Sequence, residues 1–393
     1  MNFLAVKNCI ILIQFLFAFQ AIGQIYPTHA DVDYTGDRQE RQLLDVYIPP
    51  GTETPRPAVV YIHGGGWKNG SKLGELRPEL RRLYDRAEYI IIDINYRYSL
   101  DTIWPAQLYD CKTAIRYLRR HADLYHIDSC AIGVVGYSSG GHLAAIMGTT
   151  NGIDSLAGHH LGYRDLSSDV QAVVDFFGPT DFMKADDYYP VVPPDSCNDA
   201  IIYDEPESFV SQLLGCHISD CPERVRSANP MTYIDGSDPP IRIYHGTFDC
   251  TVPFYQSQIF FESLILAGVP TDFVPVQSAV HADPIFYSTP AVNGMTNFFM
   301  EHLSRAACYQ IPTPNDSIIK TDLDVFPNPA SDFLFINFHS TAMPISVEII
   351  DTNGHVLTTS NAFQIDVKGL SKGMYFINVI LSNQIITKRF VKM

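Results

Sequence analysis

The chain has 393 residues, enough for two or three domains at about 150 residues each, so its length excludes a small disulfide-stapled scaffold. Apolar residues make up 46% and charged residues 18%, a balance that excludes an intrinsically disordered chain. With 27 basic and 43 acidic residues the net charge is −16, which disfavours nucleic acid and anionic lipid surfaces as partners.

Residues 1–23 have the pattern of a secretory signal peptide. Lys7 precedes an apolar run over residues 9–21, which ends in the small residues Ala21 and Gly23. The run is shorter than the roughly 20 apolar residues that a membrane span needs, although an uncleaved N-terminal anchor is the alternative. We expect cleavage after Gly23 and no membrane span in the mature chain.

Residues 34–309 alternate between apolar, strand-like runs and helical runs. The strand-like runs cover residues 42–48, 58–62, 89–94, 131–135, 172–177, 241–244 and 272–276. The main helical runs cover residues 105–121, 141–148, 254–267 and 290–304. This alternation predicts an α/β fold with a doubly wound, mostly parallel sheet that helices cover on both faces. Ligands of such sheets bind at the carboxyl ends of the strands.

Residues 136–140, Gly-Tyr-Ser-Ser-Gly, follow one of these strands and lead directly into a helical run. This is the G-x-S-x-G pattern in the strand-turn-helix context that places a nucleophilic serine on a tight turn. Gly136 and Gly140 leave room where side chains would collide with the neighbouring strand and helix. A chance glycine-serine turn is the alternative, but the context favours Ser138 as the nucleophile.

A second glycine-rich segment, His-Gly-Gly-Gly-Trp at residues 63–67, directly follows the strand-like run 58–62. Consecutive glycines allow backbone N–H groups to converge on the oxyanion of a tetrahedral intermediate. We expect His63 to order this loop, and a plain glycine turn is the alternative interpretation. The predicted oxyanion donors are the amides of Gly65, Gly66 and Ser139. The predicted substrate-binding residues are Trp67 and Tyr137.

A serine nucleophile needs a histidine that takes its proton and a carboxylate that orients this histidine. In this architecture the chain order is serine, acid, histidine. Asp249 follows the strand-like run 241–244, and His281 follows the run 272–276 and a short loop. We therefore predict Asp249 as the acid and His281 as the base. The weaker alternatives are His245, His302, Asp181 and Asp283.

The cysteines of the mature chain can form disulfides in an oxidising compartment, and their spacing does not indicate a metal site. The chain has 8 cysteines, of which Cys9 lies in the signal peptide, so an odd number remains. Cys216 and Cys221 lie close together in a loop region and can form a local bridge. Cys111 and Cys130 lie in helix-like and strand-like runs, where a buried unpaired thiol is expected. No spacing resembles a zinc site, and no metal or cofactor is predicted.

The composition changes near the C-terminus. Residues 310–322 are polar and contain prolines, as expected of a linker. Residues 323–393 contain short alternating strands separated by turn signals, at 333–338, 346–350, 373–381 and 384–391. This spacing predicts a small all-β sandwich as a separate C-terminal domain.

Three segments of this tail, residues 326–330, 373–375 and 388–392, give it a resemblance to the Por-type C-terminal sorting domain of type IX secretion. The resemblance implies a secreted or cell-surface protein, exported through the outer membrane. It also implies that the type IX secretion machinery is a partner that reads the tail, which is usually removed. The alternative is a carbohydrate-binding or adhesive β-module.

The segments HGGGW and GYSSG, residues 245–249 (His-Gly-Thr-Phe-Asp) and the late His281 together look like those of an α/β-hydrolase of the esterase and lipase group. The most similar subgroup is that of the BD-FAE-like and hormone-sensitive-lipase-like carbohydrate esterases, which residues 95–97 and 104–110 also match. The resemblance implies the roles given above for the serine, acid and base. It also implies that residues 181–229 form a small cap-like insertion.

Two residues depart from the pattern of this group. Ser139 stands where alanine is usual, which leaves the backbone donor intact, and Ala282 stands where glycine is common after the histidine. The resemblance implies a secreted serine esterase that cleaves acetyl or feruloyl esters, with plant polysaccharide or a small ester as substrate. The alternatives are a peptidase or formamidase with the same three residues, or an inactive hydrolase fold that serves as a surface binding module.

Overall fold

The computed structural model describes residues 23–86, 89–187, 201–303, 322–326, 330–339, 346–351, 356–360, 364–380 and 385–393. The predicted signal peptide, apart from Gly23, and residues 310–321 of the predicted linker lie outside the described residues. Cys197, Cys308 and residues 327–329 of the tail motif lie outside them too. In the part of the chain that is described, no helix combines the length and the apolar character that crossing a bilayer would require.

An eight-stranded sheet forms the core of the larger part of the chain, with the order β1-β2-β4-β3-β5-β6-β7-β8. The first two pairings are antiparallel, and all pairings from β4 onward are parallel. The strands are β1 (His29–Asp33), β2 (Leu43–Tyr47), β3 (Arg56–Ile62), β4 (Ile90–Ile94), β5 (Ile127–Tyr137), β6 (Ala172–Phe176), β7 (Ile241–Gly246) and β8 (Thr271–Val276). Strand β1 was not anticipated, because its alternating polar residues lack an apolar run.

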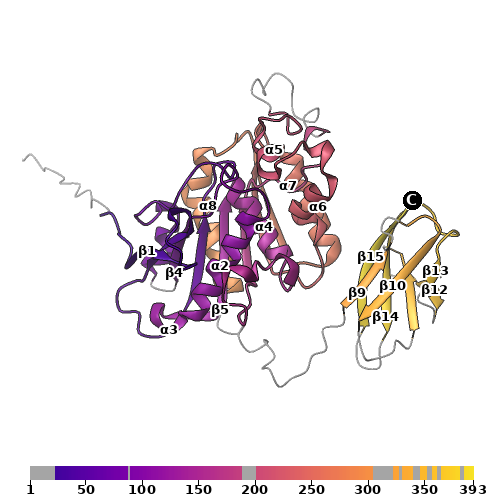
Figure 1. Cartoon of the computed structure of the whole chain (residues 1–393), viewed down its shortest axis with the longest axis horizontal. Helices are drawn as coiled ribbons and strands as arrows, with labels where there is room; N and C mark the ends of the chain where they lie inside the picture. The colour runs from indigo at the N-terminus through magenta and orange to yellow at the C-terminus, as the bar shows by residue number, and fades with distance from the viewer. Residues whose placement is uncertain are drawn as a thin grey trace, which may run out of the picture.

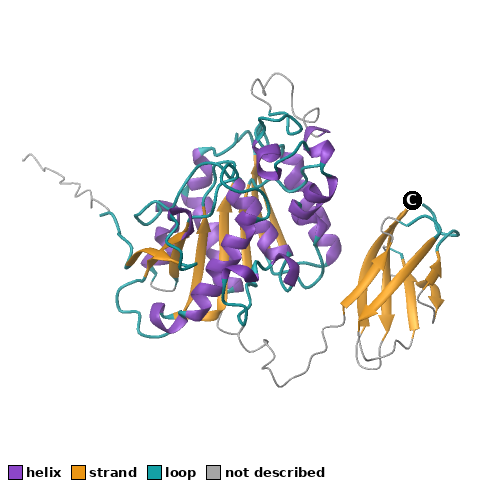
Figure 2. Ribbon diagram, viewed as in Figure 1, coloured by secondary structure: helices purple, strands orange, loops and turns teal. Residues whose placement is uncertain are grey.

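Helices cover both faces of this sheet (Figures 1 and 2). In β3, Ala58, Val60 and Ile62 pack into one apolar cluster with residues of α2, α4 and α7. Val59 and Tyr61 point to the other face, in a cluster with residues of α1 and α8. The helices are α1 (Arg81–Asp85), α2 (Ala106–Arg120), α3 (Ala122–Tyr125), α4 (Ser139–Thr149), α5 (Phe209–Leu214), α6 (Pro222–Ala228), α7 (Phe254–Ala267) and α8 (Thr289–His302). The predicted doubly wound α/β fold is confirmed.

Because of the strand register, several loops leave the sheet close together at the carboxyl ends of the parallel strands. Ile62 at the end of β3 pairs with Gly136 in β5, and Tyr137 pairs with Phe176 at the end of β6. Gly246 at the end of β7 pairs with Val276 at the end of β8. Because these strands are parallel, the loops that follow them lie together at their carboxyl ends.

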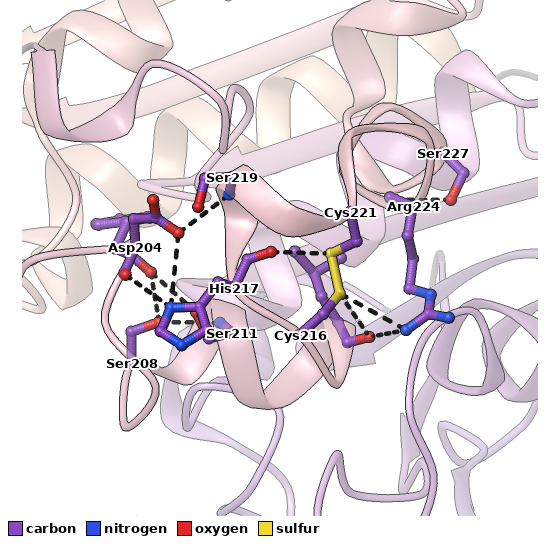
Figure 3. Close-up of a disulfide and its surroundings, with 11 residues drawn as sticks. Asp204, Ser208, Ser211, Cys216, His217, Ser219, Cys221, Arg224 and Ser227 are labelled. Carbon is purple, nitrogen blue, oxygen red and sulfur yellow. Dashed lines mark hydrogen bonds and ion pairs between the residues drawn. A yellow bond between two sulfur atoms is a disulfide. The ribbon is translucent and has the colours of Figure 1, made fainter.

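The cap-like insertion lies between β6 and β7 and includes the short helices α5 and α6. A disulfide joins Cys216 and Cys221 between these helices (Figure 3), a local bridge that the sequence had left open. Arg224 in α6 donates a hydrogen bond of 2.6 Å from Nη1 to the carbonyl oxygen of Leu214 at the end of α5. The disulfide and this hydrogen bond fix the position of α5 relative to α6.

The other cysteines give one confirmation and one correction. Cys111 is free and buried in α2, as expected. Cys130 is disulfide-bonded, as is Cys250, so the prediction of an unpaired buried thiol at Cys130 was wrong. Cys130 lies near the start of β5 and is half-buried. A cysteine from another segment can therefore reach its sulfur.

The C-terminal part contains two antiparallel sheets, with the orders β13-β10-β9 and β12-β11-β14-β15. Their buried residues, among them Leu334, Val347, Ile377 and Phe390, form one apolar cluster. Ala330 bridges to Lys392 in β15, so two of the segments that carry the tail's family resemblance meet. The strands are β9 (Asp322–Phe326), β10 (Phe333–His339), β11 (Ser346–Ile350), β12 (Val356–Ser360), β13 (Gln364–Asp366), β14 (Gly373–Ile380) and β15 (Ile385–Lys392).

Replacing both Cys216 and Cys221 by serine is expected to lower the free energy of unfolding by about 2 kcal/mol, because the unfolded chain regains the entropy that the bridge removes. Chemical denaturation of the oxidised protein measures this change. The matched control is Ser219→Ala, which alters an exposed residue of the same loop and keeps the bridge. An unchanged denaturation midpoint in the double variant would show that packing alone holds the cap.

Candidate active site

Ser138 lies on a strained turn between β5 and α4. Its backbone has φ 57° and ψ −120°, a conformation that costs a non-glycine residue free energy and is typical of functional sites. A Cβ atom at Gly136 would lie 2.0 Å from the carbonyl oxygen of Gly140, and one at Gly140 would lie 2.1 Å from that of Ile62. The turn therefore requires both glycines, as the sequence pattern predicted.

A continuous hydrogen-bonded chain links the three residues predicted as nucleophile, base and acid. His281 Nε2 lies 3.0 Å from Ser138 Oγ, and His281 Nδ1 lies 2.7 Å from Asp249 Oδ2. A carboxylate can only accept, so Nδ1 carries the proton, and Nε2 is left to accept the hydrogen bond of the serine hydroxyl. Phe177 packs edge-on against the imidazole with ring centroids 4.8 Å apart, which limits the rotation of the ring.

The Asp249 carboxylate is fully buried and surrounded by donors. Its Oδ1 accepts hydrogen bonds of 2.9 Å from the backbone N–H groups of Thr251 and Val252. Burial by itself raises the pKa of Asp249, but His281 and His245 outweigh burial and hold this pKa well below its usual range. The carboxylate is therefore ionised at neutral pH, as a group that orients and stabilises an imidazolium must be.

His245 contacts the same oxygen of this carboxylate as His281 does. Its ring is completely buried in β7, with Nε2 3.2 Å from Asp249 Oδ2 and 2.9 Å from the carbonyl oxygen of Val252. Its Nδ1 lies 2.6 Å from Ser257 Oγ in α7. An N–H at Nε2 satisfies both oxygen acceptors, and Nδ1 then accepts from the hydroxyl. From the sequence, His245 was expected to be a packing residue of its strand and a weak alternative to His281 as the base; its bond to Asp249 was not predicted.

The remaining competitors have other partners in the described part of the chain. His302 lies at the end of α8 with its ring against Phe298, at a centroid distance of 4.6 Å. Asp181 accepts a hydrogen bond of 3.3 Å from Asn229 Nδ2. Asp283 accepts one of 3.0 Å from the N–H of Ile285 and caps the 3-10 helix Pro284–Tyr287. Asp283 thus shapes the loop that follows His281.

The glycine-rich loop after β3 presents backbone N–H groups beside the serine. Gly65 and Gly66 have φ of 120° and 62°, and the N–H of Asn69 closes the turn on the carbonyl oxygen of Gly65 at 3.0 Å. No group among the described residues accepts from the N–H of Gly65 or Gly66. Ser139 is the first residue of α4, so its N–H has no acceptor within the helix. These are the three predicted oxyanion donors.

His63 orders this loop. Its ring stacks on Tyr96 with centroids 4.3 Å apart, and its Nδ1 donates to the carbonyl oxygen of Gly64 at 2.8 Å. The Tyr96 hydroxyl donates to the carbonyl oxygen of His63 at 3.0 Å. Burial lowers the pKa of His63 to about 4, so the ring is neutral at physiological pH and fits the structural role expected from the sequence.

Ser138 and His281 open onto a cavity of about 450 Å³ between the sheet edge and the cap. Its aromatic walls include Tyr61 and Tyr287, and Phe209 of the cap helix α5 closes one side. Trp67 and Tyr137 line it as well, but their exposed fractions are 0% and 4%. These two rings therefore support the wall from within the core, and their contact with substrate stays a prediction.

Comparisons with known proteins show the family of this chain. Residues 44–264 match the BD-FAE family, which is more than half of the chain. The chain belongs to the BD-FAE family. Residues 324–393 match a secretion system C-terminal sorting domain, so this BD-FAE protein carries such a domain at its C-terminus.

Two solved structures share 33% of their residues with this BD-FAE protein over 70% of its length. One is a truncated form of a carbohydrate esterase from gut microbiota, of which 96% is covered with a TM-score of 0.61. The other is a bifunctional GH43-CE protein of Bacteroides eggerthii, of which 35% is covered with a TM-score of 0.63.

Curated relatives are more distant. The probable carboxylic ester hydrolase LipM of Mycobacterium tuberculosis is 28% identical over 61% of this chain and 52% of its own. Esterase LipC of the same organism is 32% identical over 57% of this chain and 52% of its own. The chain spans about half the length of the curated relatives it matches.

His245→Phe is expected to lower kcat about tenfold. Removal of a hydrogen bond to a charged group costs about 1.5–3 kcal/mol, and we expect only part of this cost to raise the activation free energy. Steady-state kinetics on a soluble aryl acetate measures this change.

The comparison variant is His245→Gln, whose amide can restore a donor near the carboxylate and should recover part of the loss. His302→Gln, in α8, is the matched control and should leave kcat unchanged. Equal losses of kcat in both His245 variants would show that His245 acts through packing alone.

Proposed function

We propose that this chain is a secreted serine esterase that hydrolyses acetyl or feruloyl esters, with plant polysaccharide as the natural substrate. The observation that carries the proposal is the hydrogen-bonded chain Ser138–His281–Asp249 at the mouth of a cavity. Relatives named as esterases and structures named as carbohydrate esterases support it.

In the proposed reaction, His281 Nε2 takes the proton of Ser138 as its Oγ attacks the ester carbonyl carbon. The carbonyl oxygen becomes an oxyanion, which the N–H groups of Gly65, Gly66 and Ser139 stabilise. His281 then gives the proton to the leaving alcohol oxygen, and an acyl-enzyme remains. A water molecule, activated by His281, hydrolyses the acyl-enzyme and releases the acid. Asp249 stays ionised throughout and stabilises the imidazolium.

The size and lining of the cavity support a small or aromatic acyl group. A volume of about 450 Å³ accepts an acetyl or feruloyl group but not a polysaccharide chain. The exposed aromatic ring of Tyr287 in its wall can pack against a hydroxycinnamoyl ring. The polymeric alcohol part of the substrate must therefore extend out of the cavity through its opening, so that only the ester bond lies at Ser138.

We further propose the division of the whole chain. Residues 1–23 are a signal peptide, 34–309 the catalytic domain, 310–322 a linker and 323–393 the domain that the type IX secretion machinery reads. The match to a secretion system sorting domain supports this route to the cell surface or the medium. The disulfide in the cap agrees with an oxidising destination.

The test is acid release from acetylated and feruloylated xylan, measured side by side with the wild type and Ser138→Ala. The wild type should release acetic acid, ferulic acid or both, and Ser138→Ala should be at least about 10³-fold slower, as expected when a triad member is removed. Asp283→Asn is the control, because this carboxylate shapes the loop without contacting His281. Equal rates for the wild type and Ser138→Ala would place the nucleophile elsewhere.

A further inference from the structure

Lys68 brings one positive charge to the wall of the candidate active-site cavity. Among the described residues that line this cavity, it is the only lysine, arginine, aspartate or glutamate. Its side chain is half-buried, and its Nζ donates a hydrogen bond of 3.0 Å to Gln212 Oε1 in the cap helix α5. An ammonium group has three N–H donors, so this neutral partner leaves two of them.

The position of Lys68 is fixed from both ends. Its backbone N–H donates to the carbonyl oxygen of Gly65 at 3.2 Å, and the preceding Trp67 is completely buried. On the cap side, the N–H of Gln212 donates to the carbonyl oxygen of Ser208 at 3.0 Å. Lys68 thus connects the glycine-rich loop after β3 with the cap helix α5, beside the expected position of the ester.

A neighbouring lysine shows what an ordinary structural lysine does in this acidic chain. Lys72 forms ion pairs with Asp31 at 2.6 Å and with Asp45 at 2.9 Å. No carboxylate of the described residues lies within 4.0 Å of Lys68, although the chain has a net charge of −16. An unpaired cation beside a partly desolvated cavity favours an anionic ligand, because opposite charge there is only partly screened.

We propose that Lys68 receives a carboxylate of the substrate, located on the alcohol side of the ester. The inference rests on the proposed esterase function and narrows its substrate class to acyl esters of acidic polysaccharides, in which a uronic acid lies close to the ester. The half-burial of Lys68 favours the alcohol side, because a polymeric alcohol too large for the cavity must extend toward solvent.

The test compares two aryl acetates of the same shape, 4-acetoxybenzoate and its neutral analogue 4-acetoxybenzamide, with the wild type and Lys68→Gln. The wild type should favour the carboxylate. In Lys68→Gln, kcat/KM for the benzoate should fall about tenfold more than kcat/KM for the benzamide, the equivalent of one charge-assisted hydrogen bond at a half-exposed site. The difference should appear mainly in KM and should shrink at high salt.

Lys184→Gln is the matched control, because it removes the same charge from an exposed position of the cap that does not line the cavity. It should leave the ratio of the two substrates unchanged. An equal loss on both substrates in Lys68→Gln would overturn the proposed anion site and leave the esterase function standing. Failure of the wild type to cleave either acetate would instead count against the esterase function itself.

Discussion

The buried carboxylate of Asp249 is the constraint on which the arrangement of the site depends. An ionised carboxylate out of contact with water is stable only when hydrogen-bond donors surround it. Here they come from the next residues of its own loop, from His245 in β7 and from His281 beyond β8. Satisfying one carboxylate therefore fixes two loops at the sheet edge, and it places the imidazole within reach of Ser138.

The parts of the site that the sequence predicted are those in which local geometry or strand order decides. Gly136 is required by a close contact with Gly140 in its own segment, whereas Gly140 is required by a close contact with Ile62 at the end of β3. The pattern around Ser138 could still be read from the sequence because all of its residues are consecutive. Asp249 and His281 could be found because parallel strands bring their carboxyl ends together. The predicted strand positions were close for the same reason, since buried parallel strands appear as continuous apolar runs.

The features that the sequence did not predict depend on contacts between distant segments. The bond between His245 and Asp249 appears only when the chain after β7 turns back on the strand, although the spacing of four residues offered a signal. The polar edge strand β1 forms by pairing with β2 and has no apolar run of its own. The disulfide of Cys130 depends on where another segment lies, which no local pattern specifies.

The proposed esterase activity requires Ser138 to be an activated nucleophile. A fluorophosphonate, which reacts covalently with activated serine hydroxyls, tests this requirement when the adduct is located by peptide mass spectrometry. We expect a single adduct on Ser138 and a loss of ester hydrolysis in proportion to labelling. An adduct on another serine that accompanies inactivation, or full labelling of Ser138 with activity retained, would contradict it.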